Sequence, residues 1–155
     1  MPKKRFTPLL RELAHCVQAF ELLSGRHIRS LGLTPAQFNV ITVLGEKNSM
    51  NCGDLGSRAL ITKGTLTGVL DRLEQKGLVI REVSQDDRRS VIVGLTTEGH
   101  ILFNQLSGLH LDYLKPAFST LDDAFIETMT AQLAHLRTTL QQHTDRDQVN
   151  TTSSR

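Results

Sequence analysis

The sequence of 155 residues predicts a mainly α-helical fold with one small β-hairpin. Apolar residues recur at steps of three or four over most of the chain, which is the period of one face of an amphipathic helix. Several of these segments start with Thr, Asn or Asp, residues that cap helices. Between residues 78 and 95 the pattern changes to two β-branched runs around a polar loop, which indicates two strands joined by a hairpin.

The first two predicted helices cover residues 9 to about 44. The first is indicated by apolar positions on one face, namely Leu9, Leu13, Val17, Phe20 and Leu23. The second begins more sharply, because Thr34 can cap it, Pro35 suits the first helical position and Gln37 completes a capping box. We expect this helix to end at Gly45, since glycine readily takes the backbone conformation that follows a helix.

Two short helices are predicted next. Asn51 can cap one that runs to about Ala59, with Asp54 in its first turn favoured by the helix dipole. Thr62 can cap the other, which would end against Gly77. Its apolar stripe comprises Leu66, Val69, Leu70 and Leu73. Two short helices separated by a few residues match the helix-turn-helix unit, whose second helix enters the major groove of DNA.

The rest of the chain predicts a hairpin, two long helices and a polar end. The strands are Leu78–Val83 and Val91–Leu95, which extends the helix-turn-helix to a winged one. Thr96 can cap the next helix, which Pro116 ends or kinks. Asp122 can start the last, whose apolar positions are spaced like a coiled-coil seam. These positions are Phe125, Met129, Leu133, Leu136 and Leu140.

The predicted organisation places the winged lobe between dimerisation helices. From Thr144 onward the polar composition predicts disorder. The four regions are an N-terminal dimerisation helix over residues 1–32, the winged helix-turn-helix lobe over 33–99, C-terminal dimerisation helices over 100–143 and a disordered tail over 144–155.

Composition limits the classes of partner. The net charge is +2, and residues 46–96 hold eight Lys or Arg against seven Asp or Glu, so any contact with DNA must depend on where the cations lie. Cys16 and Cys52 show no metal-ligand spacing and indicate reduced thiols in a cytoplasmic protein. The sequence has no signal-peptide core and no apolar run of about 18 residues, so we expect no membrane association.

The fourth predicted helix has an outer face suited to DNA. Its first exposed turn contains Thr62, Lys63 and Thr65, whose hydroxyl and ammonium groups suit phosphate oxygens and base edges. Opposite the apolar stripe lie Gly64, Thr67, Gly68, Asp71 and Gln75. Each glycine costs about 1 kcal/mol in helix propensity relative to alanine, so either a close approach to another surface requires them or they are merely tolerated.

The hairpin loop carries four consecutive charges, Asp86, Asp87, Arg88 and Arg89. An arginine can follow the negative potential of a narrow minor groove, and a neighbouring aspartate would hold it extended. Taken alone, four charged loop residues favour a solvated turn whose charges pair with one another.

Four stretches together resemble the MarR family of bacterial transcription regulators. They are Gly64–Thr67, Leu70–Val79, Asp87–Ser90 and Leu95–Gly99. The resemblance covers residues 33–99 and implies a homodimer held by the first and the last two helices, with one recognition helix in the major groove of each half-site. The family's Asp-x-Arg wing pattern falls on Asp87 and Arg89. It implies that Arg89 reaches the minor groove, and so favours a DNA contact over a solvated turn.

We therefore predict a sequence-specific regulator of double-stranded DNA, most simply a repressor. Two recognition helices in successive major grooves require a pseudo-palindromic operator with half-sites about 34 Å apart. The resemblance also implies release by an effector, since many members respond to small aromatic or other organic acids. The residues predicted to contact DNA are Thr62, Lys63, Gly64, Thr65, Thr67, Gly68, Arg72, Asp87, Arg88 and Arg89.

Several alternatives accompany this prediction. A redox-sensing regulator could use Cys16, although peroxide-sensing relatives carry their reactive cysteine elsewhere. A winged-helix module that binds protein instead of DNA is another. Zinc sensing is disfavoured because the six histidines include no pair spaced by four residues. An enzyme is disfavoured because the sequence has no phosphate-binding Gly-rich loop, His-Glu-x-x-His pair or nucleophile elbow, and we predict no catalytic residue, cofactor or metal. Apolar residues that could line an effector pocket would serve equally as core.

Overall fold

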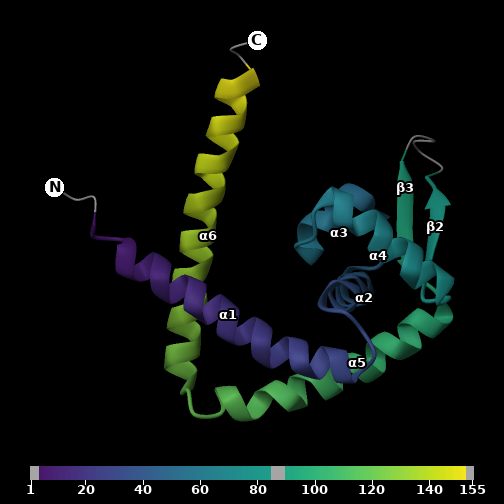
Figure 1. Ribbon diagram of the computed structural model, residues 1–155, viewed down its shortest axis with the longest axis horizontal. Coiled ribbons are helices and arrows are strands. Elements are labelled where there is room, and N and C mark those ends of the chain that lie inside the picture. Colours follow the sequence, from purple (N-terminus) through teal and green to yellow (C-terminus); the bar gives the residue numbers. More distant parts are fainter. Residues whose placement is uncertain (1–3, 85–89, 153–155) are drawn as a thin grey trace. The chain divides into compact units, whose positions relative to one another are not determined.

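The computed structural model describes the backbone of residues 4–84 and 90–152 and the side chains of residues 4–84 and 90–143. Within these ranges the chain forms six helices and three short strands, as predicted for a mainly helical fold with a hairpin (Figure 1). By contact they divide into two compact units, residues 1–114 and 115–155. In chain order the elements are α1 (Thr7–Ser30), α2 (Pro35–Lys47), β1 (Met50–Asn51), α3 (Cys52–Ala59), α4 (Lys63–Gln75), β2 (Val79–Val83), β3 (Val91–Leu95), α5 (Thr97–Phe118) and α6 (Asp123–Thr152).

Polar side chains fix most of the helix starts. Thr34 forms the predicted capping box: its Oγ1 accepts from the Gln37 amide at 3.2 Å, and Gln37 Oε1 accepts from the Thr34 amide at 3.1 Å. The predicted caps Asn51, Thr96 and Asp122 each accept from the backbone amide three residues later, at 2.8, 3.1 and 2.7 Å. Each cap satisfies an amide that the first turn of a helix would otherwise leave unpaired.

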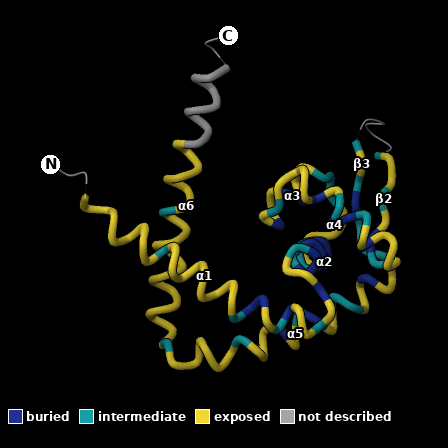
Figure 2. The backbone as a smooth tube through the Cα atoms, viewed as in Figure 1, coloured by how far each residue is buried: buried dark blue, intermediate teal, exposed yellow. Residues whose placement is uncertain are grey.

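The first unit has one hydrophobic core between α2, α3, α4 and the sheet (Figure 2). Ile28 of α1 and Leu106 of α5 also belong to this core, so both long helices of the unit are anchored in the lobe. Burial of a Leu or Ile side chain contributes about 1.5–3 kcal/mol relative to exposure. The predicted stripe of α4 is buried in full, and so is the apolar face of α2. These residues are Leu66, Val69, Leu70 and Leu73 of α4 and Phe38, Ile41 and Leu44 of α2.

The three strands form one antiparallel sheet in the order β1–β3–β2. β2 and β3 pair along their whole length and end with Val83 opposite Val91, as the two predicted runs require. β1 pairs Met50 with Val93 and so ties the residues before α3 to the hairpin. The sequence did not predict β1, because a strand of two residues has no periodicity to detect.

Gly45 does not end α2, contrary to the sequence prediction. The helix continues to Lys47 and ends where Asn48 adopts a positive φ of 63°. A Cβ atom added to Gly45 would lie 2.3 Å from Cγ of Phe103. The missing side chain therefore allows the ring of Phe103, in α5, to pack directly on α2.

Gly45→Ala is expected to destabilise the protein by about 1–3 kcal/mol, the usual cost of overpacking a core. Phe103→Leu should recover part of this loss in the double variant, because it makes room for the added methyl group. Urea unfolding of the single and double variants measures both effects. Gly108→Ala is the matched control, since an added Cβ there meets no atom within 4 Å. Equal stability of the Gly45→Ala and native proteins would contradict the close packing of Phe103.

The C-terminal helices extend further than predicted. Pro116 lies in the last turn of α5, which ends two residues later at Phe118. α6 continues to Thr152 and so includes residues 144–152, for which the polar composition predicts disorder. Residues 123–152 contain neither Gly nor Pro, and polar side chains of ordinary helix propensity do not end a helix by themselves.

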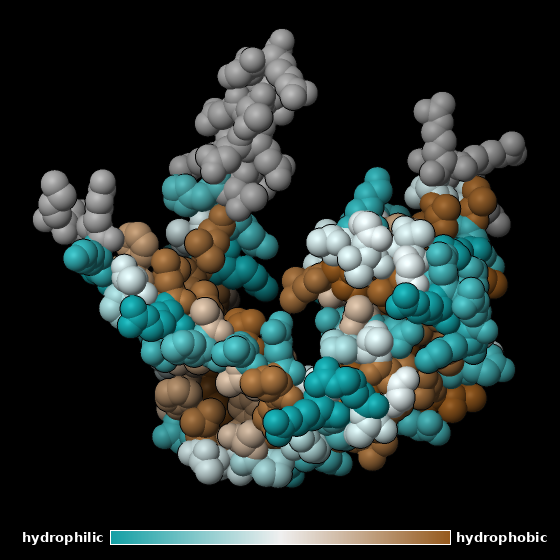
Figure 3. Space-filling view, in the orientation of Figure 1, coloured by the Kyte–Doolittle hydropathy of each residue, from teal (hydrophilic) through white to brown (hydrophobic). Residues whose placement is uncertain are grey.

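Apolar faces of α1 and α6 remain uncovered. Leu9, Val17 and Phe20 of α1 are about half exposed, and apolar side chains reach the surface over α1 in Figure 3. Most of the predicted seam of α6 is exposed, and no described side chain of that helix is buried. Extended apolar surface of this kind marks a site of association. None of the helices in the described part of the chain is both long and apolar enough to cross a membrane.

Candidate nucleic-acid interface

α3 and α4 form the two helices of a helix-turn-helix. Leu60 ends α3 in the left-handed conformation, with φ of 57°, and the Ile61 amide donates to the Gly56 carbonyl at 2.9 Å. Thr62 occupies the cap position of α4, as predicted. However, its hydroxyl donates to Oγ1 of Thr65 at 3.0 Å and accepts no hydrogen bond from a backbone amide of the first turn. The prediction at Thr62 is therefore right in position and wrong in its hydrogen bond.

The buried stripe of α4 determines which of its residues face outward. Because successive turns repeat the same face, the side opposite the stripe lies at the surface. All the predicted contact residues on α4 and at its cap belong to this surface. Thr62, Lys63, Gly64, Thr65, Thr67 and Arg72 are exposed, and Gly68 is half-buried.

Gly64 and Gly68 lie in open space on this outer face. A Cβ atom added at either position would have no atom within 4 Å, whereas one added at Gly56 of α3 would lie 3.1 Å from the Ile61 carbonyl oxygen. The packing of the chain therefore requires no glycine at positions 64 and 68, although each costs about 1 kcal/mol in helix propensity. This favours close approach of an external surface as the reason for both.

Arg81 of β2 bridges two carboxylates of α4. Its Nη2 lies 2.7 Å from Oδ1 of Asp71, and its Nε lies 3.1 Å from Oε2 of Glu74, to which Nη2 also donates. Hydrogen bonds to Glu74 and then to Asp71 raise the pKa of Arg81, and the hydrogen bond from Arg81 lowers the pKa of Glu74. Asp71, which the sequence placed on the outer face, is thus paired with a strand of the hairpin.

The bridge was not predicted, because its partners lie seven and ten positions from Arg81 and on another element. It has two effects on the outer face of α4. It offsets two negative charges that would repel phosphates, and it ties the hairpin to the helix.

Arg81→Gln is expected to weaken binding of α4 to DNA roughly tenfold, because two carboxylates lose their counter-ion beside a polyanion. The free energy of unfolding should change little, since solvent screens exposed ion pairs. Fluorescence anisotropy with the same labelled duplex for every variant measures the affinity, and urea unfolding measures the stability. Arg11→Gln removes the same charge from an exposed position of α1 and is the control. Equal affinities of the two variants would contradict a specific effect of the bridge.

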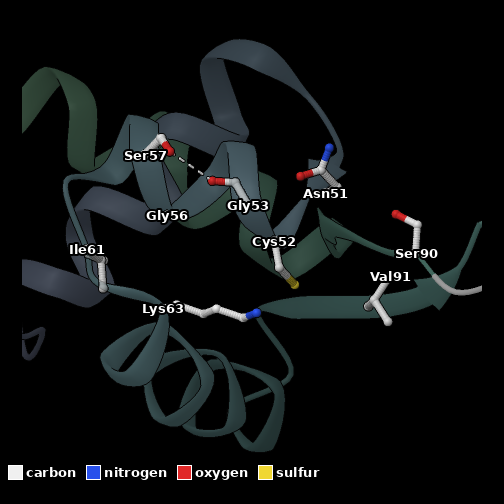
Figure 4. Close-up of a pocket in the computed structure, with 9 residues that line it drawn as sticks. All are labelled: Asn51, Cys52, Gly53, Gly56, Ser57, Ile61, Lys63, Ser90 and Val91. Carbon is white, nitrogen blue, oxygen red and sulfur yellow. Dashed lines mark hydrogen bonds between the residues drawn. The ribbon is translucent and has the colours of Figure 1, made fainter. Parts of the chain in front are cut away.

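A pocket of about 440 Å³ opens where α3, the start of α4 and the start of β3 meet (Figure 4). The Cys52 thiol and the Lys63 ammonium point into it. Because Ser90 follows the hairpin loop directly, the pocket joins the first turn of α4 to the root of the wing. The lining comes from several elements, and Lys63 is the only one of its residues that the sequence predicted as a DNA contact. The lining residues are Asn51, Cys52, Gly53, Gly56, Ser57, Ile61, Lys63, Ser90 and Val91.

The remaining candidate residues are the charged residues between the two hairpin strands and the two cysteines. Asp87, Arg88 and Arg89 fall within residues 85–89, which the structure does not describe. Cys16 is exposed on α1, Cys52 is half-buried, and both are free thiols. Where side chains are described, no three His, Cys, Asp or Glu residues lie close enough together to hold a metal ion.

Comparison with known proteins matches both the sequence and the fold. The family model of the MarR family matches residues 33–91. The homoprotocatechuate degradative operon repressor of Escherichia coli is 32% identical over 128 residues, which cover 83% of this chain and 81% of that protein. A crystal structure of a mutant MarR from E. coli with operator DNA has a TM-score of 0.76 and 28% identity, covering 86% of this chain and 96% of that one. The structure of NadR with 4-hydroxyphenylacetate has a TM-score of 0.71 and 27% identity, covering 81% and 89%.

The matches extend beyond the winged lobe. Residues 33–91 contain the helix-turn-helix, the whole of β2 and the first residue of β3, and the E. coli repressor aligns with most of the chain. The fold likewise agrees with that of the MarR structure over most of both chains. This chain therefore belongs to the MarR family of winged helix-turn-helix transcriptional regulators.

Proposed function

We propose that this protein is a homodimeric repressor that binds pseudo-palindromic double-stranded DNA and leaves it when a small organic molecule binds. The outer face of α4 is the observation that supports DNA binding most strongly. This face is largely exposed, and its side chains are mostly small or able to form hydrogen bonds, while the opposite face of the same helix is buried. Such a helix can enter the major groove without any change in the core.

The first turn of α4 supplies the main contacts in this proposal. Thr62, Lys63 and Thr65 reach phosphate oxygens and base edges at the positive end of the helix dipole. Thr67 and Arg72 continue the same face. Because the net charge of the chain is only +2, the affinity depends on these placed groups and falls as the salt concentration rises.

Glycines and the wing complete the proposed interface. Gly64 and Gly68 allow the backbone of α4 to come close to the bases. Arg89 enters the minor groove, Asp87 holds Arg89 extended, and Arg88 contacts a phosphate. Contacts in two neighbouring grooves would fix the orientation of the lobe on the duplex.

A second copy of the chain is the proposed cover for the exposed apolar faces. A two-fold dimer presents two α4 helices, which is why the operator should be pseudo-palindromic with half-sites about one helical turn apart. The residues that the second copy would cover include Leu9, Val17 and Phe20 of α1, Leu109 and Tyr113 of α5, and Phe125, Met129, Leu133 and Leu140 of α6.

A small aromatic acid is the proposed effector. The name of the E. coli relative refers to homoprotocatechuate degradation, and the NadR structure holds 4-hydroxyphenylacetate. Both are small aromatic acids, which supports the same ligand class here. We place the protein in the cytoplasm, where such acids and the DNA meet, and assign it no cofactor. Cys16 is exposed, so thiol oxidation is the alternative signal.

A gel-shift assay with the DNA upstream of the gene tests this proposal. The native protein should form a complex that excess specific duplex removes and unrelated duplex does not, and 4-hydroxyphenylacetate or a related acid should release it. A folded dimer that binds no duplex at low salt would contradict DNA binding and favour a module that binds protein. If peroxide releases the native protein from DNA but does not release Cys16→Ser, the signal is thiol oxidation and not an aromatic acid.

A further inference from the structure

A buried polar cluster joins the C-terminal part of α1 to α5. His110 of α5 is only 7% exposed. Its Nδ1 lies 2.9 Å from Nδ1 of His27, and its Nε2 lies 3.1 Å from Oγ of Ser24, both on α1. Phe38 of α2 packs edge-on against His110 with ring centroids 4.7 Å apart. His27 in turn stacks on Tyr113, with centroids 4.2 Å apart and ring planes at 7°.

The contact between the two imidazoles limits how many protons the pair can hold. A hydrogen bond between two Nδ1 atoms needs one N–H donor and one acceptor. A neutral pair satisfies this, and so does a pair with one extra proton, because a charged ring can donate to a neutral one. When both rings are charged, every ring nitrogen is a donor, and two like charges face each other across a contact largely closed to water.

We propose that His27 and His110 form a proton switch, in which the second proton parts α1 from α5 and lowers the affinity for DNA. The effect on DNA rests on the proposed function, because α1 and α5 carry apolar faces assigned there to the dimer. A change in how these helices pack would alter the spacing of the two α4 helices, and binding to two half-sites requires a fixed spacing.

The surroundings of His110 favour its neutral form. Burial, and next the charge of His27, hold the pKa of His110 below its ordinary value of 6.5. The groups that face it are Ser24 and His27 from α1 and Phe38 from α2, and no carboxylate of the described residues contributes to the shift. The nearest charged residues along the same two helices are Arg26, Arg29 and Asp112, all exposed.

The sign of the pH effect follows from this lowered pKa. Below pH 6.5 a histidine in the unfolded chain binds a proton that His110 in the folded protein does not bind. The free energy of unfolding therefore decreases as the pH falls. The stability from His110 is complete above pH 6.5 and is lost as the pH falls toward the folded pKa. DNA affinity should fall in the same range.

Fluorescence anisotropy with the upstream duplex, at constant ionic strength and from about pH 7.5 to about pH 5.5, tests the switch. The native protein should lose affinity roughly tenfold, which corresponds to about 1.4 kcal/mol of binding free energy. His110→Gln should lose less than about twofold, because its amide can still bond to Ser24 and His27 without ionising. His100→Gln, an exposed position of α5, is the control and should behave like the native protein.

His27→Phe provides a second variant should His110→Gln fail to fold. It keeps a ring on Tyr113 but cannot carry the second charge, so its loss of affinity should be smaller than that of the native protein. Native affinity that stays constant or rises with acid would overturn the proposal, as would losses in both variants equal to the native loss.

A native protein that binds no duplex at pH 7.5 would instead contradict the proposed function. Thermal unfolding would then test the proton switch without DNA. The melting temperature of the native protein should fall over the same pH range by more than that of His110→Gln. Parallel decreases in the two proteins would overturn the switch.

Discussion

Leu133→Asp in α6 is expected to yield a folded monomer whose affinity for operator DNA is lower by roughly 100-fold or more, because two linked binding sites gain avidity of that order. Leu133 is about half exposed on the apolar seam of α6, where dimerisation would bury an unpaired carboxylate. It takes no part in the core of the first unit, so the winged lobe should fold unchanged.

Ala131→Asp is the matched control for this variant. It places the same charge on the opposite face of α6, at another exposed position. Light scattering after size exclusion measures the oligomeric state, and fluorescence anisotropy measures the affinity. A Leu133→Asp monomer with native affinity would contradict the need for a dimer. Equal losses in both variants would show that charge on α6 matters and the seam does not.

Gly64→Leu is expected to lower DNA affinity about 100-fold, which corresponds to roughly 2.7 kcal/mol. The added side chain would fill the space between α4 and the bases. Within the chain it meets nothing, since even the first added carbon has no atom within 4 Å. Leucine also favours a helix over glycine by almost 1 kcal/mol. The variant should therefore be at least as stable as the native protein while it binds far more weakly.

Gln75→Leu tests whether any apolar addition to the helix has this effect. Gln75 is exposed at the last residue of α4, away from the first turn. Urea unfolding and anisotropy of both variants give the comparison. Native affinity in Gly64→Leu would mean that DNA does not approach this face. A fall in its stability would mean that the glycine serves the fold instead.

Local patterns predicted most of the fold. Thr34 with Gln37, and Asn51 with Asp54, are short-range signals, and the structure forms the hydrogen bonds that they predict. The stripe of α4 was also predictable, because a helix repeats its faces at a fixed period. Predictions that depended on distant residues failed. The predicted helix end at Gly45 is wrong, because the reason for this glycine is the contact with Phe103 of another helix.

In the candidate site as well, features within one helix were predictable and contacts between distant elements were not. Lys63, Thr65 and the two glycines lie on one helix, so their common face could be read from spacing alone. Arg81 was missed because its role depends on the pairing of β2 with β3 and on the position of that sheet beside α4. Likewise, His27 and His110 are 83 positions apart, and only the packing of α1 on α5 brings their rings together.

In the proposed complex, α4 of each copy reads the major groove of one half-site. Guanine N7 lies in the major groove, so methylation of N7 before binding tests this contact. Two clusters of interfering guanines are expected, with centres about one helical turn apart. Gly64→Leu protein, at concentrations that give residual binding, should lose this pattern. Binding that N7 methylation does not affect, or a single cluster of interfering guanines, would contradict major-groove contacts by two copies.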